Sequence, residues 1–187
     1  MVGVAVGWRP GRGGTAIGVL RAGGAGWSVV TAPRGVGSLS SVACPTSSTC
    51  YAGGFLSPPA PGGTLPVRRF PGAMVATADA GHHWRIVPLP AAAGPVNAVS
   101  CAGPSACVAA GVSADASARL TAGAAGPPGM ALSTIDGGRH WQVDVLPRSA
   151  SGIAGVSCVA AAVAPSCDAT AAGPASSSLV LAGVNAG

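Results

Sequence analysis

Short hydrophobic runs recur along this chain, and turn-forming residues separate them. One stretch shows the pattern: Val96–Cys101 alternates apolar with small or polar residues, and a five-residue turn leads to Cys107–Gly111. A long Gly/Pro/Ala loop, about 112–129, then reaches Met130–Thr134, and a tight Asp-Gly-Gly turn precedes His140–Val145. Alternation over four to eight residues is typical of a half-buried strand. No stretch sustains a 3.6-residue period, so we expect almost no helix.

The same pattern repeats with a period of 57 residues. Three residue classes keep this spacing: Trp27, Trp84 and Trp141; Cys44, Cys101 and Cys158; Pro33, Pro90 and Pro147. Aliphatic positions such as Val42, Val99 and Val156 follow in the same register. Four short antiparallel strands in roughly 40–60 residues are the size of one β-propeller blade. The period therefore predicts an all-β chain built from repeated four-stranded sheets.

The repeat divides the chain into four units. We expect complete blades at 38–90 and 95–147, flanked by incomplete blades at 1–33 and 152–187, because the first unit begins at a second strand and the last ends before its tryptophan. A propeller needs ring closure to cover its sheet edges. We therefore expect a partial propeller that is a segment of a larger one or pairs with another copy.

Composition and charge narrow the classes of protein. The 30 Gly and 17 Pro supply many turns, while 49% hydrophobic residues argue against a disordered chain. All ten cationic side chains are Arg and all five anionic ones are Asp. These arginines are scattered, whereas nucleic-acid binders cluster their charge, so we expect no nucleic-acid partner. No signal peptide is visible, and the uncharged stretches 149–167 and 169–187 are too rich in Gly, Ala and Ser to predict a membrane span.

Two tight turns carry a family resemblance. They read Thr77-Ala78-Asp79-Ala80-Gly81-His82-His83-Trp84 and Thr134-Ile135-Asp136-Gly137-Gly138-Arg139-His140-Trp141. Both resemble the Asp-box, or bacterial neuraminidase repeat, Ser/Thr-x-Asp-x-Gly-x-x-Trp. That family forms β-propellers, among them sialidases, sortilin-like receptor domains and photosystem II assembly-factor-like propellers. The first copy departs from the motif, with Ala22 and Gly24 in place of Asp and Gly, and the last has Asn185 for Asp.

The resemblance implies a structural box. We expect the carboxylates of Asp79 and Asp136 to accept backbone N–H bonds across their turns. Gly81 and Gly138 permit the positive φ that such turns demand. We expect Trp84 and Trp141 to pack between neighbouring blades, and Thr77 and Thr134 to complete the motif. His82, His83 and His140 are expected to be exposed turn residues without a catalytic or metal role.

The six cysteines form three local pairs, each flanking the loop between the first two strands of a unit. The pairs are Cys44/Cys50, Cys101/Cys107 and Cys158/Cys167. Their even number and repeated spacing predict disulfides and an extracytoplasmic or secreted protein. Zinc binding and reduced thiols are the alternatives, although five intervening residues are a loose fit to a zinc knuckle. We predict no metal and no cofactor.

The residues count against an enzyme. The resemblance to sialidases would require an arginine triad, a Tyr nucleophile activated by Glu, and an acidic general acid/base. This chain has no Glu and one tyrosine, Tyr51, which we interpret as a packing residue. We therefore predict a non-catalytic binding or scaffold module. A fragment of a sialidase-like glycoside hydrolase, or a propeller fragment without function, is the alternative.

Strand alternation places a candidate ligand surface. The cysteine hairpins and Asp boxes lie at one end of the sheets, and the long loops 54–73 and 111–129 lie at the other. Loops on a rigid scaffold commonly carry function. Arg68, Arg69 and Phe70 form the most ligand-like cluster there, because an Arg pair beside an aromatic suits acidic, glycan or peptide partners. An unknown protein, peptide or glycan is thus the expected partner, with self-association through open blade edges as a further alternative.

Overall fold

A computed structural model of the chain describes residues 3–9, 14–21, 26–57, 70–114, 127–160, 166–173 and 178–182. These residues form β-strands, turns and bends, with no helix among them. The predicted all-β class is therefore confirmed. Within the described ranges no helix is long and apolar enough to cross a membrane.

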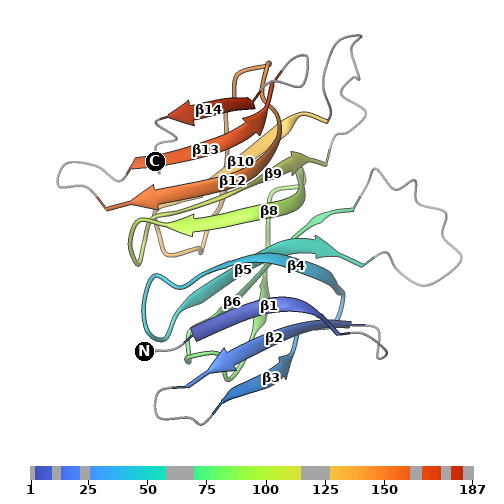
Figure 1. Cartoon of the computed structure of the whole chain (residues 1–187), viewed down its shortest axis with the longest axis vertical. Helices are drawn as coiled ribbons and strands as arrows, with labels where there is room; N and C mark the ends of the chain where they lie inside the picture. The colour runs from blue at the N-terminus through green and yellow to red at the C-terminus, as the bar shows by residue number, and fades with distance from the viewer. Residues whose placement is uncertain are drawn as a thin grey trace, which may run out of the picture.

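The strands form four antiparallel sheets arranged in a row (Figure 1). Sheet 1 contains β1 (Gly3–Arg9), β2 (Gly14–Leu20) and β3 (Trp27–Thr31). Sheet 2 contains β4 (Val36–Ala43), β5 (Cys50–Leu56), β6 (Gly72–Thr77) and β7 (Arg85–Val87). Sheet 3 contains β8 (Ala93–Cys101), β9 (Cys107–Ser113), β10 (Gly129–Thr134) and β11 (Gln142–Asp144). Sheet 4 contains β12 (Ser151–Val159), β13 (Ser166–Ala172) and β14 (Ser178–Ala182). Two four-stranded sheets between two three-stranded ones match the predicted partial propeller.

The position of a sheet in the row explains the burial of its strands. In β5 and β9 five consecutive residues are buried, since sheets 2 and 3 have a neighbour on both faces. In β13 buried and exposed residues alternate along the whole strand, because sheet 4 is covered on one face only. Successive side chains of a strand point to opposite faces, so alternation in β13 is the expected pattern for an end sheet.

The core consists of side chains packed between successive sheets. Between sheets 2 and 3, Met74 and Val87 meet Val96, Leu132 and Trp141. The side chain of Val96 packs directly against the backbone of β5, where a Cβ atom on Gly53 would overlap it. Small residues such as Gly53 therefore allow the sheets to pack face to face.

Several strand boundaries differ from the sequence prediction, two of them by two residues or more for a clear physical reason. The last strand of the third unit, predicted as His140–Val145, is only Gln142–Asp144. Its first two residues belong to the preceding turn, because the N–H of His140 is bonded to the side chain of Asp136. The strand predicted from Val96 begins earlier, at Ala93, with register shifts around Pro95, which has no N–H to donate to the ladder.

Candidate binding face and the turns opposite it

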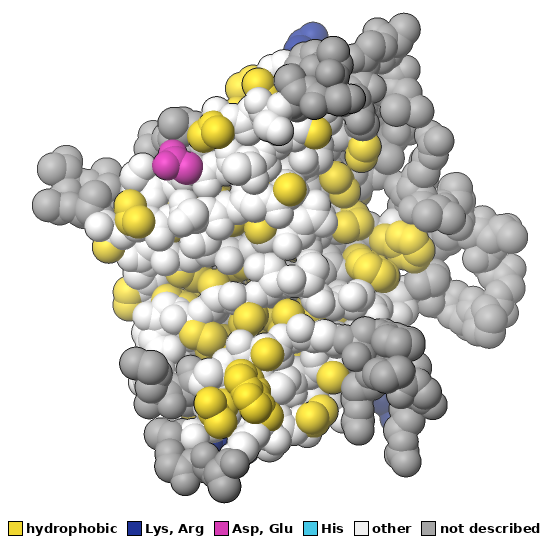
Figure 2. Space-filling view, viewed as in Figure 1, with side chains coloured by type: hydrophobic (Ala, Val, Ile, Leu, Met, Phe, Trp, Pro, Cys, Tyr) yellow, Lys and Arg dark blue, Asp and Glu magenta, His cyan; other side chains and the backbone are white. Residues whose placement is uncertain are grey.

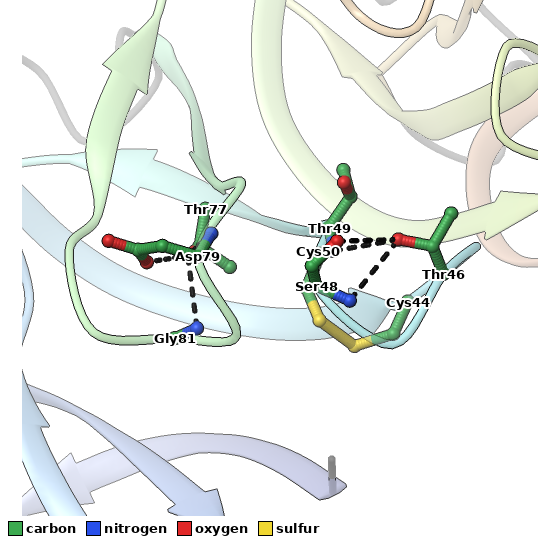
Figure 3. The surroundings of a disulfide bond; sticks show 8 residues. All are labelled: Cys44, Thr46, Ser48, Thr49, Cys50, Thr77, Asp79 and Gly81. Atoms are coloured by element: carbon green, nitrogen blue, oxygen red, sulfur yellow. Dashed lines mark hydrogen bonds between the residues drawn. A yellow bond between two sulfur atoms is a disulfide. The ribbon is translucent and has the colours of Figure 1, made fainter. Parts of the chain in front are cut away.

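The turn that joins β6 to β7 is built around the side chains of Thr77 and Asp79 (Figure 3). The Thr77 hydroxyl donates to Oδ1 of Asp79 at 2.8 Å and accepts the N–H of Gly81 at 3.1 Å. Oδ1 of Asp79 also accepts the N–H of His83 at 2.9 Å. Gly81 has φ of 84°, which an L side chain rarely adopts. We call this segment, Thr77–Trp84, the first aspartate turn.

The second aspartate turn, Thr134–Trp141, repeats this geometry 57 residues later. The Thr134 hydroxyl donates to Oδ1 of Asp136 at 2.9 Å and accepts the N–H of Gly138 at 3.1 Å. Oδ1 of Asp136 accepts the N–H groups of Arg139 and His140 at 2.9 and 3.0 Å. The two turns thus use equivalent residues to accept backbone N–H groups.

Each aspartate also pairs with a histidine four residues later. Oδ2 of Asp79 lies 2.6 Å from Nδ1 of His83, and Oδ2 of Asp136 lies 2.5 Å from Nδ1 of His140. The backbone N–H and then the imidazole of that histidine hold the pKa of each carboxyl well below its usual range. His83 and His140 are exposed, as predicted, but their pairing with the aspartates was not predicted. The signal was present, because the Asp-x-x-x-His spacing occurs in both copies.

The cysteine hairpins lie at the same end of the sheets, and those of sheets 2 and 3 are hydrogen-bonded to the aspartate turns. All three expected pairs are disulfides: Cys44–Cys50, Cys101–Cys107 and Cys158–Cys167. In sheet 2 the N–H of Ala80 donates to the carbonyl of Ser48, and in sheet 3 the N–H of Gly137 donates to that of Ser105. Figure 3 shows the first hairpin beside its turn. Turn and hairpin of one sheet thus form a single hydrogen-bonded unit.

The tryptophans and Tyr51 join these units between sheets. Trp141 is buried and meets the ring of Tyr51, in sheet 2, edge to face at a centroid distance of 6.2 Å. The Tyr51 hydroxyl donates to the carbonyl of Gly137 at 2.5 Å. Trp84 packs against the cluster between sheets 1 and 2. Tyr51 is therefore a packing residue, as expected, with an inter-sheet hydrogen bond that the sequence did not indicate.

The opposite end of the sheets is the place predicted for the long loops 54–73 and 111–129, of which 58–69 and 115–126 lie outside the described residues. Arg68 and Arg69 of the predicted ligand cluster lie outside the described residues, so their placement stays a prediction. Phe70 is described: its ring lies 5.1 Å from that of Phe55, where the loop leaves β5 and returns to β6. We call this end of the sheets, where β5 and β9 end and β6 and β10 begin, the loop face.

A cavity of about 230 Å³ opens on the loop face of sheet 3. Its wall includes Met130 of β10, Val143 and Asp144 of β11, and Leu146 and Arg148 from the connection to sheet 4. No local sequence pattern predicted this site, because its residues come from four separate segments of the chain. Apolar walls with a few polar groups are typical of ligand sites.

Asp144 is the unusual group of this cavity wall. Its Oδ1 accepts a hydrogen bond from the buried Ser133 hydroxyl at 2.8 Å, while its buried Oδ2 has no hydrogen-bond partner within the part of the chain that the structure describes. Burial raises the pKa of this carboxyl, since desolvation disfavours the charged form. Among the described residues, no three His, Cys, Asp or Glu side chains gather into a metal site.

Comparison with known proteins supports the fold and leaves the family open. No family model matches the chain, and no curated protein matches it. Among solved structures, the chain is similar to YCF48 bound to D1 peptide, with a TM-score of 0.52 and 15% identity. The match covers 80% of this chain and 38% of that one, so this chain spans well under half of its structural neighbour. Because that neighbour is a β-propeller, the four sheets are the blades of a partial β-propeller.

Proposed function

We propose that this chain is a non-catalytic binding module of the Asp-box β-propeller type, whose loop face takes a peptide or protein segment. The observation that carries the proposal is the contrast between the two ends of the sheets. At the turn end, each threonine is hydrogen-bonded to its aspartate, and the cysteines are joined in disulfides. At the loop face lies a cavity, and one oxygen of Asp144 in its wall has no hydrogen-bond partner among the described residues.

The comparison favours a peptide over a glycan. The solved neighbour YCF48 is bound to a peptide. In this chain Val143 and Leu146 of the cavity wall, and the Phe55–Phe70 pair at the loop face of sheet 2, offer apolar contacts of the kind that peptide side chains use. Figure 2 shows hydrophobic side chains exposed at several places on the surface of the molecule.

The residue inventory supports a non-catalytic role. Tyr51 would be the one candidate for a sialidase-like nucleophile, and its hydroxyl is tied to the carbonyl of Gly137 at the turn end. Glycoside hydrolysis needs a carboxylate pair or a Tyr/Glu equivalent, and the chain holds no Glu. A sialidase-like hydrolase fragment is the second candidate. Turnover of a fluorogenic sialoside by the full chain would favour it.

The three disulfides support an extracytoplasmic location. Disulfides persist in oxidising compartments and are rare in the cytosol. All six cysteines are paired, one pair in each of sheets 2, 3 and 4. We infer that the module works outside the cytoplasm, where its disulfides remain oxidised.

Peptide display against the full chain tests the proposal, with calorimetry on the selected peptides. Val143→Asp changes a half-exposed aliphatic residue on the cavity wall. Ile135→Asp is the matched control, since Ile135 is about equally exposed but lies in the second aspartate turn, at the other end of sheet 3. We expect Val143→Asp to weaken binding at least about tenfold and Ile135→Asp to leave it unchanged. Equal affinities for both variants, or no selectable peptide, would refute the proposal.

A further inference from the structure

The third copy of the repeat departs from the first two at a pair of positions beside the cavity. In sheet 3 these positions hold Ser133 of β10 and Asp144 of β11, which are hydrogen-bonded to each other. The equivalent residues of the earlier copies are all apolar: Ala76 and Val87 in sheet 2, Val19 and Val30 in sheet 1. In each sheet the second residue of the pair lies opposite the equivalent residue of the preceding strand, so the three pairs occupy the same place.

The fold itself does not require a polar pair at this place. Sheets 1 and 2 keep the same antiparallel order of strands with Val19, Ala76 and Val87 buried there. In sheet 3, by contrast, Oδ2 of Asp144 is buried and has no hydrogen-bond partner within the described ranges. Burying a carboxyl oxygen in this way costs free energy, whereas an apolar pair of similar size does not. A costly departure from the repeat is typical of a functional position.

Asp144 lines the cavity of the loop face together with aliphatic side chains. Met130, Val143 and Leu146 form part of the same wall. Among the described residues that line the cavity, the charged ones are Asp144 and Arg148. Its volume, about 230 Å³, is smaller than the roughly 300–1,000 Å³ of pockets that hold drug-sized molecules, so the cavity suits one side chain of a larger partner.

Within the described ranges, no cation of the chain is paired with this carboxyl. The ion pairs there are those of the two aspartate turns, at the other end of the sheets. Arg148 is exposed and forms no ion pair with Asp144. A carboxylate shielded from water is stabilised by a charged hydrogen-bond donor, and such charge-assisted bonds are about twice as strong as neutral ones. The chemistry of the wall therefore favours a cation from outside the chain.

We propose that the cavity takes the side chain of a lysine or arginine from the bound peptide, whose charged end pairs with Asp144. In the proposed peptide-binding role, on which this assignment rests, Asp144 is the residue that determines specificity. A long cationic side chain carries its charge on an apolar stem. Met130, Val143 and Leu146 contact that stem, and the carboxyl turns toward the charged end as it enters. Side-chain changes of this kind are common when interfaces form.

Two other charges bear on such a cation. Arg148 repels it, but water screens the exposed guanidinium and keeps the repulsion small. In Val143→Asp the new carboxylate is likewise exposed and attracts the cation little, while the aliphatic contact to the stem is lost. That variant therefore still weakens peptide binding.

Peptides selected by display on the full chain, with calorimetry on each, test the proposal. We expect the selected peptides to share a lysine or an arginine. Norleucine in place of that lysine, or citrulline in place of that arginine, removes the charge and keeps the stem. Either change should weaken binding at least about tenfold, as loss of a charge-assisted hydrogen bond typically does. Selected peptides without a cationic residue in common, or equal affinities of the charged and uncharged peptides, would overturn the proposal.

The double variant Ser133→Ala/Asp144→Val gives sheet 3 the pair that sheet 2 has. It removes the carboxyl without leaving the serine hydroxyl unpartnered. We expect its urea unfolding midpoint to equal or exceed that of the wild type, because both polar partners are replaced together. Its affinity for the cationic peptide should fall at least about tenfold. Asp168→Asn is the matched control: it removes one negative charge from an exposed residue beside the hairpin of sheet 4 and should leave the affinity unchanged. Unchanged affinity of the folded double variant would refute the role of Asp144.

Two further variants separate the role of Asp144 from the peptide-binding role of the loop face. Binding that Val143→Asp weakens, but that the double variant and norleucine leave unchanged, keeps the loop face as the peptide site and removes the cation. Binding that Val143→Asp leaves unchanged refutes the proposed function itself. Arg148→Ala should strengthen binding of the cationic peptide by up to about fivefold. If it instead weakens binding, the cavity takes an anionic group and the assignment to Asp144 is wrong.

Discussion

Replacing Gly138 by alanine probes the contact between the second aspartate turn and sheet 2. Gly137 and Gly138 are adjacent and both have positive φ, 72° and 74°. A Cβ atom on Gly138 would lie 2.6 Å from Cε1 and 3.0 Å from Cζ of Tyr51, whereas one on Gly137 would lie 3.5 Å from its nearest neighbour, the carbonyl oxygen of Pro104. The two substitutions thus share backbone strain and differ in overlap with the tyrosine ring.

The magnitudes follow from these distances. A left-handed alanine costs about 1–2 kcal/mol, and the lower entropy of the unfolded chain offsets about 0.4–1 kcal/mol of that cost. At the position equivalent to Gly137, the first aspartate turn already has an alanine, Ala80, with φ of 59°. For Gly138→Ala we add overpacking of about 1–3 kcal/mol, because the Tyr51 ring is held by its bond to Gly137 and by Trp141. We expect Gly138→Ala to destabilise the chain by about 1–3 kcal/mol more than Gly137→Ala.

Urea unfolding of the oxidised chain, followed by tryptophan fluorescence, measures both variants. Tyr51→Val supplies the second half of a double-mutant cycle, since sheet 3 has Val108 at the equivalent position. Without the ring, the cost of Gly138→Ala should fall to that of Gly137→Ala, which gives a coupling energy of at least about 1 kcal/mol. If Gly137→Ala and Gly138→Ala are equally destabilising, the argument from overlap is wrong. It is also wrong if the cost of Gly138→Ala is unchanged in the Tyr51→Val chain.

Three further predictions concern single polar groups. Tyr51→Phe removes the bond to Gly137 and should cost about 1 kcal/mol, seen as a fall in Tm of about 2–4 °C; an unchanged Tm would mean that water replaces the hydroxyl. The lowered pKa values of Asp79 and Asp136 stabilise the fold above the ordinary aspartate pKa of about 4, and this contribution is lost as the pH falls through the folded-state pKa values. Asp136→Asn should therefore reduce the loss of unfolding free energy measured between about pH 5 and pH 2, and a wild-type acid slope in that variant would contradict the assignment. The raised pKa of Asp144 has the opposite effect on stability. Its contribution to the free energy of unfolding is fully present below about pH 4 and declines as the pH rises through the raised pKa. Asp144→Asn should flatten that decline, and parallel pH profiles for the two chains would refute it.

Much of the fold could be predicted from the sequence because the repeat is local. Each unit brings its own alternating runs, its own turns and its own cysteine pair within about 57 residues. The strands pair with their neighbours along the chain, so every disulfide and every sheet follows from short-range spacing. The positive φ of Gly81 and Gly138 follows equally from the turn motif. The errors lie at strand ends, where the turn of Asp136 takes His140 out of the strand.

The binding face was less predictable, because its parts come from different segments. The cavity joins β10, β11 and the connection that follows, and nothing in Asp144 as a residue type shows that one of its oxygens is buried without a partner. The Tyr51 hydroxyl likewise bonds a carbonyl 86 residues away along the chain. Such contacts depend on how one sheet lies against the next, which no short-range pattern encodes.

The sequence by itself determined the repeated unit: four strands in a complete copy, a disulfide hairpin, and an aspartate turn with its tryptophan. Only the tertiary structure decided what each copy of that unit touches. Trp27 and Trp141 occupy the same place in the repeat, yet one is exposed and the other buried. Local sequence sets the strand and the face on which a side chain stands, whereas burial requires a second sheet on that face, and that sheet belongs to another part of the chain.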